Sequence, residues 1–328
     1  MRSLVIAIGS GQFYRTVEPV FQCVRQAVFT LLLAGIFCGV SNTHAEKDDA
    51  LPKYTYVETK RLTSLVNDAA SLIATEGESA FQQFGKPGSK WLQDSYIFVY
   101  AEDGTVAYHP VEPELIGENL MELKDPFGKP VVKYITDIAK QSEKNAAGWV
   151  MYHWEDNTQL IPVRKSSYIR KVVAPNGKLY AVGSGRYNLK IEKRWVAKRV
   201  IDASELIKRL GTARAFPRLL DLSSPFYFLD TFIFVLDEQG HTLVDPAFPT
   251  MAGRNILDFK DSAGVFPIKQ LLKKLTTAED AWIQYLWPKP GAHVPSRKLF
   301  YARKVKVDGQ TVIVGSDFYL ASPVWMKG

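Results

Sequence analysis

The stretch DSYIFVYAEDGTVAYHPVEPELIGENLMELKDPFG, residues 94–128, decides the fold, because it recurs without a gap 136 positions later as DTFIFVLDEQGHTLVDPAFPTMAGRNILDFKDSAG, residues 230–264. Identical residues run through the whole stretch, among them the pairs Asp94/Asp230, Ile97/Ile233, Phe98/Phe234, Val99/Val235, Gly104/Gly240, Asn119/Asn255, Asp125/Asp261 and Gly128/Gly264. The match resumes at an offset of 133, where PVRKSSYIRKV at 162–172 aligns with PSRKLFYARKV at 295–305. A repeat of this length is a whole small domain rather than a solenoid unit of about 20 to 50 residues. The chain therefore holds two copies of one module.

The first 45 residues have the composition of an export signal. Three arginines and one glutamate accompany the apolar run AVFTLLLAGIFCGV at 27–40, which is followed by Thr43-His44-Ala45. A run of this length is too short to span a bilayer, and small residues at 43 and 45 suit cleavage after Ala45. We predict a signal peptide at 1–45 and a periplasmic mature protein. The alternative is that the segment stays uncleaved and anchors the protein in the membrane.

Cysteine usage and charge exclude several classes of function. Both cysteines, Cys23 and Cys38, lie in the predicted signal peptide, so the mature chain has no disulfide, thiolate metal site or catalytic thiol. Removing three arginines and one glutamate reduces the formal net charge from +7 to +5. The remaining basic residues are scattered among acids rather than gathered in one patch, which argues against nucleic acid as a partner.

The hydrophobic pattern of each copy predicts strand, strand, helix and three further strands. An amphipathic helix is expected from Tyr56 to about residue 84, and a second near 131–140. An Asp-Gly turn at 103–104 joins the first two strands, and the last three are expected at 149–154, 164–173 and 179–187. Such short connections require antiparallel pairing. Residues 191–215 return to helical periodicity. We therefore place the long helix and first module at 54–190, a linking helix at 191–227 and the second module at 228–322.

Three strings carry a resemblance to a known family: YIFVYAEDGTVAYHP, IGENLMELKDPFGK, and IQYLWPKPGAHVPSRKLFYARKV together with VGSDFY. On these residues the chain resembles the Cache domains, extracytoplasmic ligand sensors of bacterial receptors. The string Tyr-Leu-Trp-Pro-Lys-Pro-Gly at 285–291 is similar to a signature of single and tandem Cache domains, and the resemblance extends over about residues 54–319. It implies an α+β fold of two PAS-like modules, each a five-stranded antiparallel sheet with flanking helices, preceded by a long N-terminal helix. The ligands it implies are small organic acids, amino acids or amines.

Candidate ligand-binding residues of the first copy lie on its predicted strands. They are Tyr96, Phe98, His109, Tyr152, Trp154, Arg164, Lys165 and Tyr168. The aromatic pairs share strand faces by the two-residue period, so they either line a pocket or only fill the core. A cation beside a tyrosine hydroxyl can bind a carboxylate through charge-assisted hydrogen bonds, and the family pattern points to Lys165 with Tyr168.

An i, i+3 spacing puts that pair on opposite faces of a regular strand. Either a bulge intervenes, or Arg164, Tyr168 and Arg170 form the inner row, or the whole string is a solvated basic face.

The second copy differs at the positions that decide ligand charge. Its candidates are Phe232, Phe234, Asp245, Tyr285, Trp287, Lys298 and Tyr301. Asp245 replaces His109, and Asp317 replaces Gly185. An acid there disfavours an anionic ligand, so we expect the first copy to bind the anion and the second to be structural or amine-selective.

Signals for catalysis are weak. Ser184 and Ser316 do not fit a nucleophile elbow, and no histidine pair has the spacing of a zinc motif, so no cofactor and no metal are expected. We predict a non-enzymatic extracytoplasmic sensor for a small organic acid or amino-acid-like ligand. Because the sequence stops soon after the second copy, we expect a separate membrane receptor or kinase as partner. The alternatives are a hydrolase without a recognisable motif and a structural module without a ligand.

Overall fold

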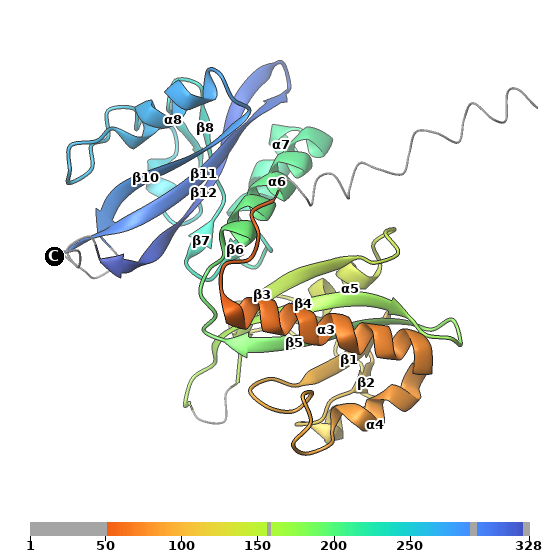
Figure 1. The fold of residues 1–328 in the computed structure, drawn as a ribbon. Coiled ribbons are helices and arrows are strands. Elements are labelled where there is room, and N and C mark those ends of the chain that lie inside the picture. The colour runs from red at the N-terminus through yellow and green to blue at the C-terminus, as the bar shows by residue number, and fades with distance from the viewer. Residues whose placement is uncertain (1–50, 156–158, 289–293, 324–328) are drawn as a thin grey trace, which may run out of the picture. The chain divides into compact units, whose positions relative to one another are not determined.

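The structure is a computed structural model that describes residues 51–155, 159–288 and 294–323 (Figure 1). The predicted signal peptide lies outside these residues. The first module contains α3 (Val57–Glu76), η1 (Gly77–Ala80), α4 (Phe81–Phe84), β1 (Ile97–Ala101), β2 (Val106–Tyr108), η2 (Pro113–Leu115), α5 (Val131–Ala139), β3 (Ala147–Trp154), β4 (Val163–Val173) and β5 (Leu179–Tyr187). Helices α6 (Lys193–Leu210) and α7 (Thr212–Leu220) follow. The second module contains β6 (Tyr227–Phe228), β7 (Thr231–Phe232), β8 (Phe234–Asp237), β9 (Thr242–Val244), η3 (Pro249–Met251), α8 (Pro267–Leu275), β10 (Asp280–Pro288), β11 (Pro295–Val307) and β12 (Gln310–Pro323).

The first module is a five-stranded antiparallel sheet in the order β2-β1-β5-β4-β3, with helices on both faces. Helix α3 runs along one face (Figure 1). Its buried side chains, Val66, Ala69 and Ile73, pack against sheet residues such as Val172. Helix α5 packs on the other face, against Ile169 and its neighbours. Because both faces are covered, the central strands bury side chains on both sides of the sheet.

Helix α3 begins where the sequence pattern predicts but ends earlier. Gly77 takes a φ of +65°, which a residue with a side chain rarely adopts, and the α-helix stops there. A 3₁₀ turn and the four-residue α4 continue to Phe84. The predicted long helix to about residue 84 is therefore confirmed in its extent, with a 3₁₀ turn at Gly77–Ala80 that was not predicted.

The second module repeats the sheet in the order β10-β11-β12-β8-β9, which matches the first strand for strand. Helix α6 packs on β11 and β12 as α3 packs on the first sheet, and α8 takes the place of α5. The short hairpin of β6 and β7 precedes this sheet and was not predicted. The predicted α+β fold of two modules with five-stranded antiparallel sheets is confirmed.

Several of the duplicated residues hold the same loop in both modules. Asp125 Oδ1 accepts the backbone N–H groups of Phe127 and Lys129, both at 2.9 Å, and its Oδ2 accepts that of His153 at 3.0 Å. Asp261 does the same for residues 263, 265 and 286, at 2.8 to 2.9 Å. Asp125 and Asp261 thus hold the loop that follows each hairpin. Because their carboxylate oxygens already accept backbone N–H groups, these two residues are not candidates for ligand binding.

Candidate functional site

The inner face of strand β4 presents Lys165, Ser167 and Ile169 toward the α5 side of the first sheet. Ile169 belongs to the core that includes α5. The Ser167 and Tyr152 hydroxyls are 2.9 Å apart, and Lys165 is 2 % exposed. The pairing of β4 with β3 and β5 continues without a bulge, so residues alternate strictly between the two faces.

Arg164, Tyr168 and Arg170 lie on the other face of β4. This face points away from the Lys165 side chain. Tyr168 packs beside Trp149, with ring centroids 5.3 Å apart, and Arg170 donates to Asn67 Oδ1 on α3 at 2.6 Å. The predicted clamp of Lys165 with Tyr168 is therefore wrong, because the two residues lie on opposite faces. The alternative inner row of Arg164, Tyr168 and Arg170 is also wrong, because this row lies on the face of the sheet that is turned away from the cavity.

Lys165 lies in a buried aromatic surrounding. Its ammonium donates a hydrogen bond to the Tyr96 hydroxyl at 2.9 Å. It also lies 4.8 Å from the centroid of the Tyr96 ring, 5.1 Å from that of Tyr187 and 6.0 Å from that of Trp154. Aromatic faces attract a cation, and the attraction grows when water is excluded. Burial raises the pKa of Tyr96 well above its usual range, so this phenol stays neutral, and its oxygen accepts the hydrogen bond from the ammonium.

A small cavity adjoins this ammonium, with a volume of about 10 Å³, enough for about one water molecule. Apolar and aromatic groups form most of its wall, and the polar groups converge from Tyr96, His109, Tyr152 and Lys165. The lining residues are Tyr96, Phe98, Tyr100, His109, Val131, Ile135, Tyr152, Trp154 and Lys165. Six of the eight residues predicted for the first site line this cavity; Arg164 and Tyr168 do not.

His109 closes the cavity from the end of β2 and is 4 % exposed. Its Nδ1 accepts the backbone N–H of Glu112 at 3.0 Å, so the neutral ring carries its proton on Nε2. Burial and the positive charge of Lys165 lower the pKa of His109 to about 4. At neutral pH the imidazole is therefore an uncharged hydrogen-bond donor.

Tyr100, Ser167 and Glu112 lie at or beside this cavity but were not predicted from the sequence. Tyr100 and Ser167 follow from the two-residue period once the inner face is known. Glu112 lies on the irregular loop after β2, where no periodicity applies. The only available signal was that the repeat places Phe248 at the position of this acid.

In the second module, a carboxylate of the protein lies beside Lys298, the counterpart of Lys165. Lys298 Nζ lies 2.9 Å from Asp317 Oδ1, and the Tyr285 hydroxyl donates to Asp317 Oδ2 at 2.8 Å. Asp245 accepts backbone N–H groups of residues 247 and 248, and burial raises its pKa. Lysine, two acids and tyrosine thus form a group in which the cation already has a counter-ion.

The other candidates of the second module are dispersed. Tyr301 packs on Trp282, with centroids 4.7 Å apart, just as Tyr168 packs on Trp149, and so lies on the face opposite Lys298. Trp287 is 37 % exposed and packs on Phe259. Phe232 stacks on Tyr227 in the added hairpin, and Phe234 packs on Phe300. Of the Tyr-Leu-Trp-Pro-Lys-Pro-Gly string, residues 289–291 lie outside the described residues.

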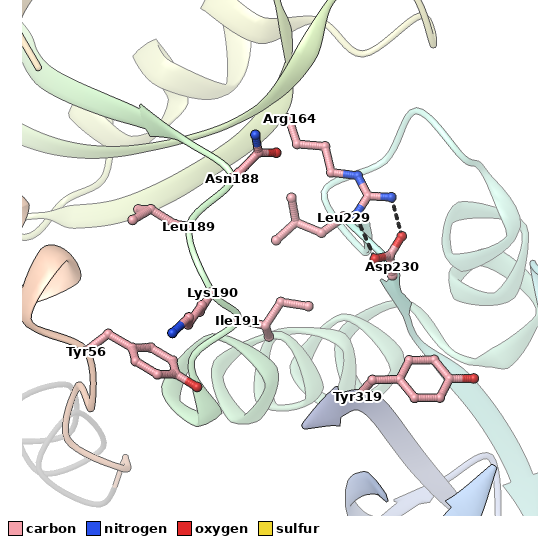
Figure 2. A pocket seen from close by; sticks show the side chains of 9 residues that line it. All are labelled: Tyr56, Arg164, Asn188, Leu189, Lys190, Ile191, Leu229, Asp230 and Tyr319. Carbon is pink, nitrogen blue, oxygen red and sulfur yellow. Dashed lines mark hydrogen bonds and ion pairs between the residues drawn. The ribbon is translucent and has the colours of Figure 1, made fainter. Parts of the chain in front are cut away.

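A larger hollow of about 270 Å³ lies beside the segment 188–191 (Figure 2). Figure 2 shows Arg164 directed at Asp230, and the guanidinium donates to both carboxylate oxygens, at 2.6 Å to Oδ2. The hollow is lined by Tyr56, Arg164, Asn188, Leu189, Lys190, Ile191, Leu229, Asp230 and Tyr319. Arg164 thus serves an ion pair here, which explains why this predicted ligand residue is absent from the cavity at Lys165.

Ser184 does not have the setting of a nucleophile. Its side chain is fully buried, and its hydroxyl donates to the Tyr96 backbone carbonyl at 2.8 Å. Within the described ranges, no helix is long and apolar enough to cross a membrane.

Comparison with known proteins gives the family. The model of the Cache domain matches residues 88–192, and that of single Cache domain 2 matches residues 201–320. The chain contains two Cache domains in tandem. Cache domains of chemotaxis receptors are extracytoplasmic ligand sensors.

Individual relatives are also chemotaxis proteins. The methyl-accepting chemotaxis protein McpP of Pseudomonas putida is 31 % identical over 115 residues, which are 35 % of this chain and 20 % of the relative. The chain thus matches about a fifth of that protein's length. A methyl-accepting chemotaxis protein of Vibrio parahaemolyticus is 22 % identical, with a TM-score of 0.34, over 39 % of this chain and 88 % of that one. A Cache chemosensory domain described for carboxylic acid recognition is 23 % identical, also with a TM-score of 0.34, over 45 % of this chain and 100 % of that one.

Proposed function

We propose that this protein is a periplasmic sensor whose first Cache domain binds a small organic acid at Lys165. Binding occurs without turnover, and the loaded form is presented to a separate membrane partner. The alternative is a hydrolase without a recognisable motif; Ser184 gives it no support, because this serine is buried and its hydroxyl donates to a backbone carbonyl.

The observation that carries this proposal is the contrast between positions 185 and 317. Strand β12 sends the Asp317 carboxylate to Lys298, whereas the matching position on β5 is Gly185. A Cβ at Gly185 would lie 2.9 Å from Lys165 Cε, so the strand passes close beside this lysine without supplying an acid. A buried ammonium is costly unless charge and hydrogen bonds compensate it. A ligand carboxylate would add a negative charge and charge-assisted hydrogen bonds to those that the protein supplies.

The remaining groups of the cavity suit the same ligand. His109 Nε2 and the Tyr96 hydroxyl are neutral hydrogen-bond donors at neutral pH, and Tyr152 adds a further hydroxyl. Charge-assisted hydrogen bonds from such donors to a carboxylate are among the stronger ones in proteins. Phe98, Val131 and Ile135 form the apolar part of the wall. The cavity of about 10 Å³ holds about one water molecule, so its wall must move apart for an acid to enter, and the proposed ligand has few carbon atoms.

The second Cache domain is proposed to be structural or amine-selective. Asp317 and Asp245 place two carboxylates near one lysine, so an added anion would be repelled. A protonated amine would be attracted by the same two carboxylates. The two domains of the tandem therefore differ in the charge of the ligand that they can accept.

The proposed location and partner rest on the relatives. The relative McpP is a methyl-accepting chemotaxis protein, and Cache domains of such receptors are extracytoplasmic. We propose export by the segment 1–45, with retention as an uncleaved anchor as the alternative. The partner would be a membrane receptor or kinase that recognises the loaded first domain.

A thermal-shift screen tests this function. Acetate, propionate, pyruvate and succinate are compared with alanine and putrescine on the wild-type protein and on Lys165→Met. A ligand at 100 times its dissociation constant adds about 2.7 kcal/mol of stability, so a binding acid should raise the melting temperature by several degrees. Lys165→Met should abolish that shift. Lys171→Met is the matched control, because Lys171 lies on the same face of β4 and bonds the carbonyl of Gln141. A shift by putrescine alone, or one that survives Lys165→Met, would contradict the proposal.

A further inference from the structure

Helix α7 is fixed on the second Cache domain by one of its faces. Helix α6 ends at Gly211, whose φ is +73°, and α7 begins directly after it and packs beside it (Figure 1). Asp308 Oδ2 accepts both the backbone N–H and the hydroxyl of Thr212, each at 2.8 Å. Ala215 and Leu219 are fully buried. The opposite face of α7 is therefore held toward solvent.

This outer face joins a basic row to an apolar row. Arg214 and Arg218 lie one turn apart on it, and both are exposed. Pro217 and Leu220 form the adjoining row by the helical period. Leu220 is 43 % exposed, and Leu222, two residues further on, is 50 % exposed. Large apolar side chains thus meet water directly beside two arginines.

The last turn of α6 adds to the positive charge. Lys208 and Arg209 are exposed there, so residues 206–220 carry four basic side chains and no acidic one. Two acids flank this group: Glu205 pairs with Lys208 at 3.3 Å, and Asp221 accepts a backbone N–H of the following loop at 2.9 Å. The group therefore keeps an excess of positive charge.

The first Cache domain has the same turn without these side chains. Helix α3 also ends at a glycine of positive φ, Gly77, and the turn after it also buries two side chains, Ala80 and Phe84. Aligned on these buried residues, the outer positions of the first copy are Ser79, Gln82, Gln83 and Gly85, where the second copy has Arg214, Pro217, Arg218 and Leu220. The fold of this turn therefore requires neither arginines nor an exposed leucine, which indicates a separate role for them.

We propose that α7 rests on an anionic phospholipid membrane through the surface formed by Lys208, Arg209, Arg214, Arg218, Leu220 and Leu222. Arginine and lysine attract anionic headgroups, and apolar side chains beside them enter the boundary between headgroups and acyl chains. An acidic protein surface would match the charges but not the two exposed leucines, whereas an anionic bilayer accommodates both. The inference does not depend on which ligand the first domain binds.

Hydrogen exchange of the full chain on lipid vesicles tests this proposal, because it reports each segment separately and so distinguishes α7 from residues 1–45. Vesicles of phosphatidylglycerol and phosphatidylcholine should slow amide exchange in residues 208–222 several-fold, whereas vesicles of phosphatidylcholine alone should not. High salt should remove the effect, since salt screens exposed charges. Unchanged exchange on the anionic vesicles, or equal slowing on both kinds of vesicle, would overturn the proposal.

Two double variants with the same loss of charge make the test specific. The double variant Arg214→Gln, Arg218→Gln should raise the lipid concentration for half-maximal slowing roughly 25-fold, about fivefold for each arginine. The matched control is Lys60→Gln, Arg61→Gln on the exposed side of α3, which should leave that concentration unchanged. Because all four side chains are exposed, both variants should melt as the wild type does. Equal losses in the two variants would reduce the effect to net charge and overturn the proposed surface.

A third double variant separates a membrane from an acidic protein. Leu220→Ser, Leu222→Ser keeps every charge and should still weaken binding to the anionic vesicles several-fold, because less apolar surface enters the bilayer. If this variant binds the vesicles as tightly as the wild type does, the leucines do not enter lipid. The surface would then be a charge match for an acidic protein, and the membrane proposal would fail.

Discussion

The ammonium of Lys298 lies 2.9 Å from the carboxylate of Asp317, with both side chains almost enclosed by the second Cache domain. The first domain retains the lysine as Lys165 but has Gly185 at the position of the acid. The two copies of the module thus differ in that the second sheet supplies a carboxylate to its lysine and the first does not, and the proposed acid site of the first domain rests on this difference.

Removal of the acid in the second domain should be costly. Asp317→Asn leaves Lys298 buried without its counter-ion, which destabilises a protein by about 3 to 5 kcal/mol. Denaturant unfolding of the variant measures this loss. The double variant Lys298→Met, Asp317→Asn removes both charges and should recover most of the stability. A loss below about 1 kcal/mol for the single variant would show that the pair is screened by solvent.

His109 should make the unliganded protein less stable at acidic pH. Its pKa is about 4 in the folded state, below the 6.5 of an ordinary histidine. Between these values the unfolded chain binds a proton that the folded domain refuses, so stability falls as the pH drops from 6.5 toward 4. The loss attributable to this residue is on the order of 3 to 4 kcal/mol at most. Denaturation across this range with His109→Gln should show a shallower slope, and an unchanged slope would contradict a neutral buried imidazole.

The duplicated aspartates should be equally important for stability. Asp125→Ala and Asp261→Ala each remove the acceptor of three backbone N–H groups in a buried loop. A loss of about 3 kcal/mol is expected for each, because hydrogen bonds to a charged acceptor are replaced by unsatisfied donors. Denaturant unfolding of the two variants measures it. A marked loss in one module only would mean that the shared sequence does not reflect a shared loop.

Conservative substitutions on the two faces of the first sheet should differ in their effect on affinity. Tyr96→Phe removes the hydroxyl that contacts Lys165, and it should weaken acid binding several-fold. Tyr168→Phe alters the packed face beside Trp149 and should leave affinity unchanged. Calorimetry with an acid from the screen compares them. Loss of affinity in Tyr168→Phe would restore the predicted clamp that the strand geometry rejects.

The fold could be predicted from the sequence because the duplication sets the module boundaries and each strand has a clear period. The orientation of β4 could not. Helices α3 and α5 cover both faces of the sheet, so Ile169 on one face and Val172 on the other are equally buried, and no apolar face stands out. The spacing of Lys165 and Tyr168 already excluded a shared face on a regular strand; only the structure decides which of them points inward.

Glu112 illustrates a second limit. Its proximity to His109 arises from a loop that folds back on itself through a backbone hydrogen bond to an imidazole. No hydrophobic period or turn motif predicts that contact. The early end of α3 belongs to the same class, because Gly77 is tolerated within many helices and ends this one by adopting a positive φ.

The central claim, a carboxylate site at Lys165 in the first Cache domain, is tested most directly by calorimetry with the best acid on Lys165→Ala and on the double variant Lys298→Ala, Asp317→Ala. The first change removes a charge-assisted hydrogen bond of about 1.5 to 3 kcal/mol, which corresponds to a loss of affinity of roughly 10- to 150-fold. The double variant removes one charge of each sign from its domain, which leaves the net charge unchanged, and should bind as the wild type does. Equal losses in both would mean two working sites, a loss only in the double variant would move the site to the second domain, and unchanged affinity in Lys165→Ala would contradict the account.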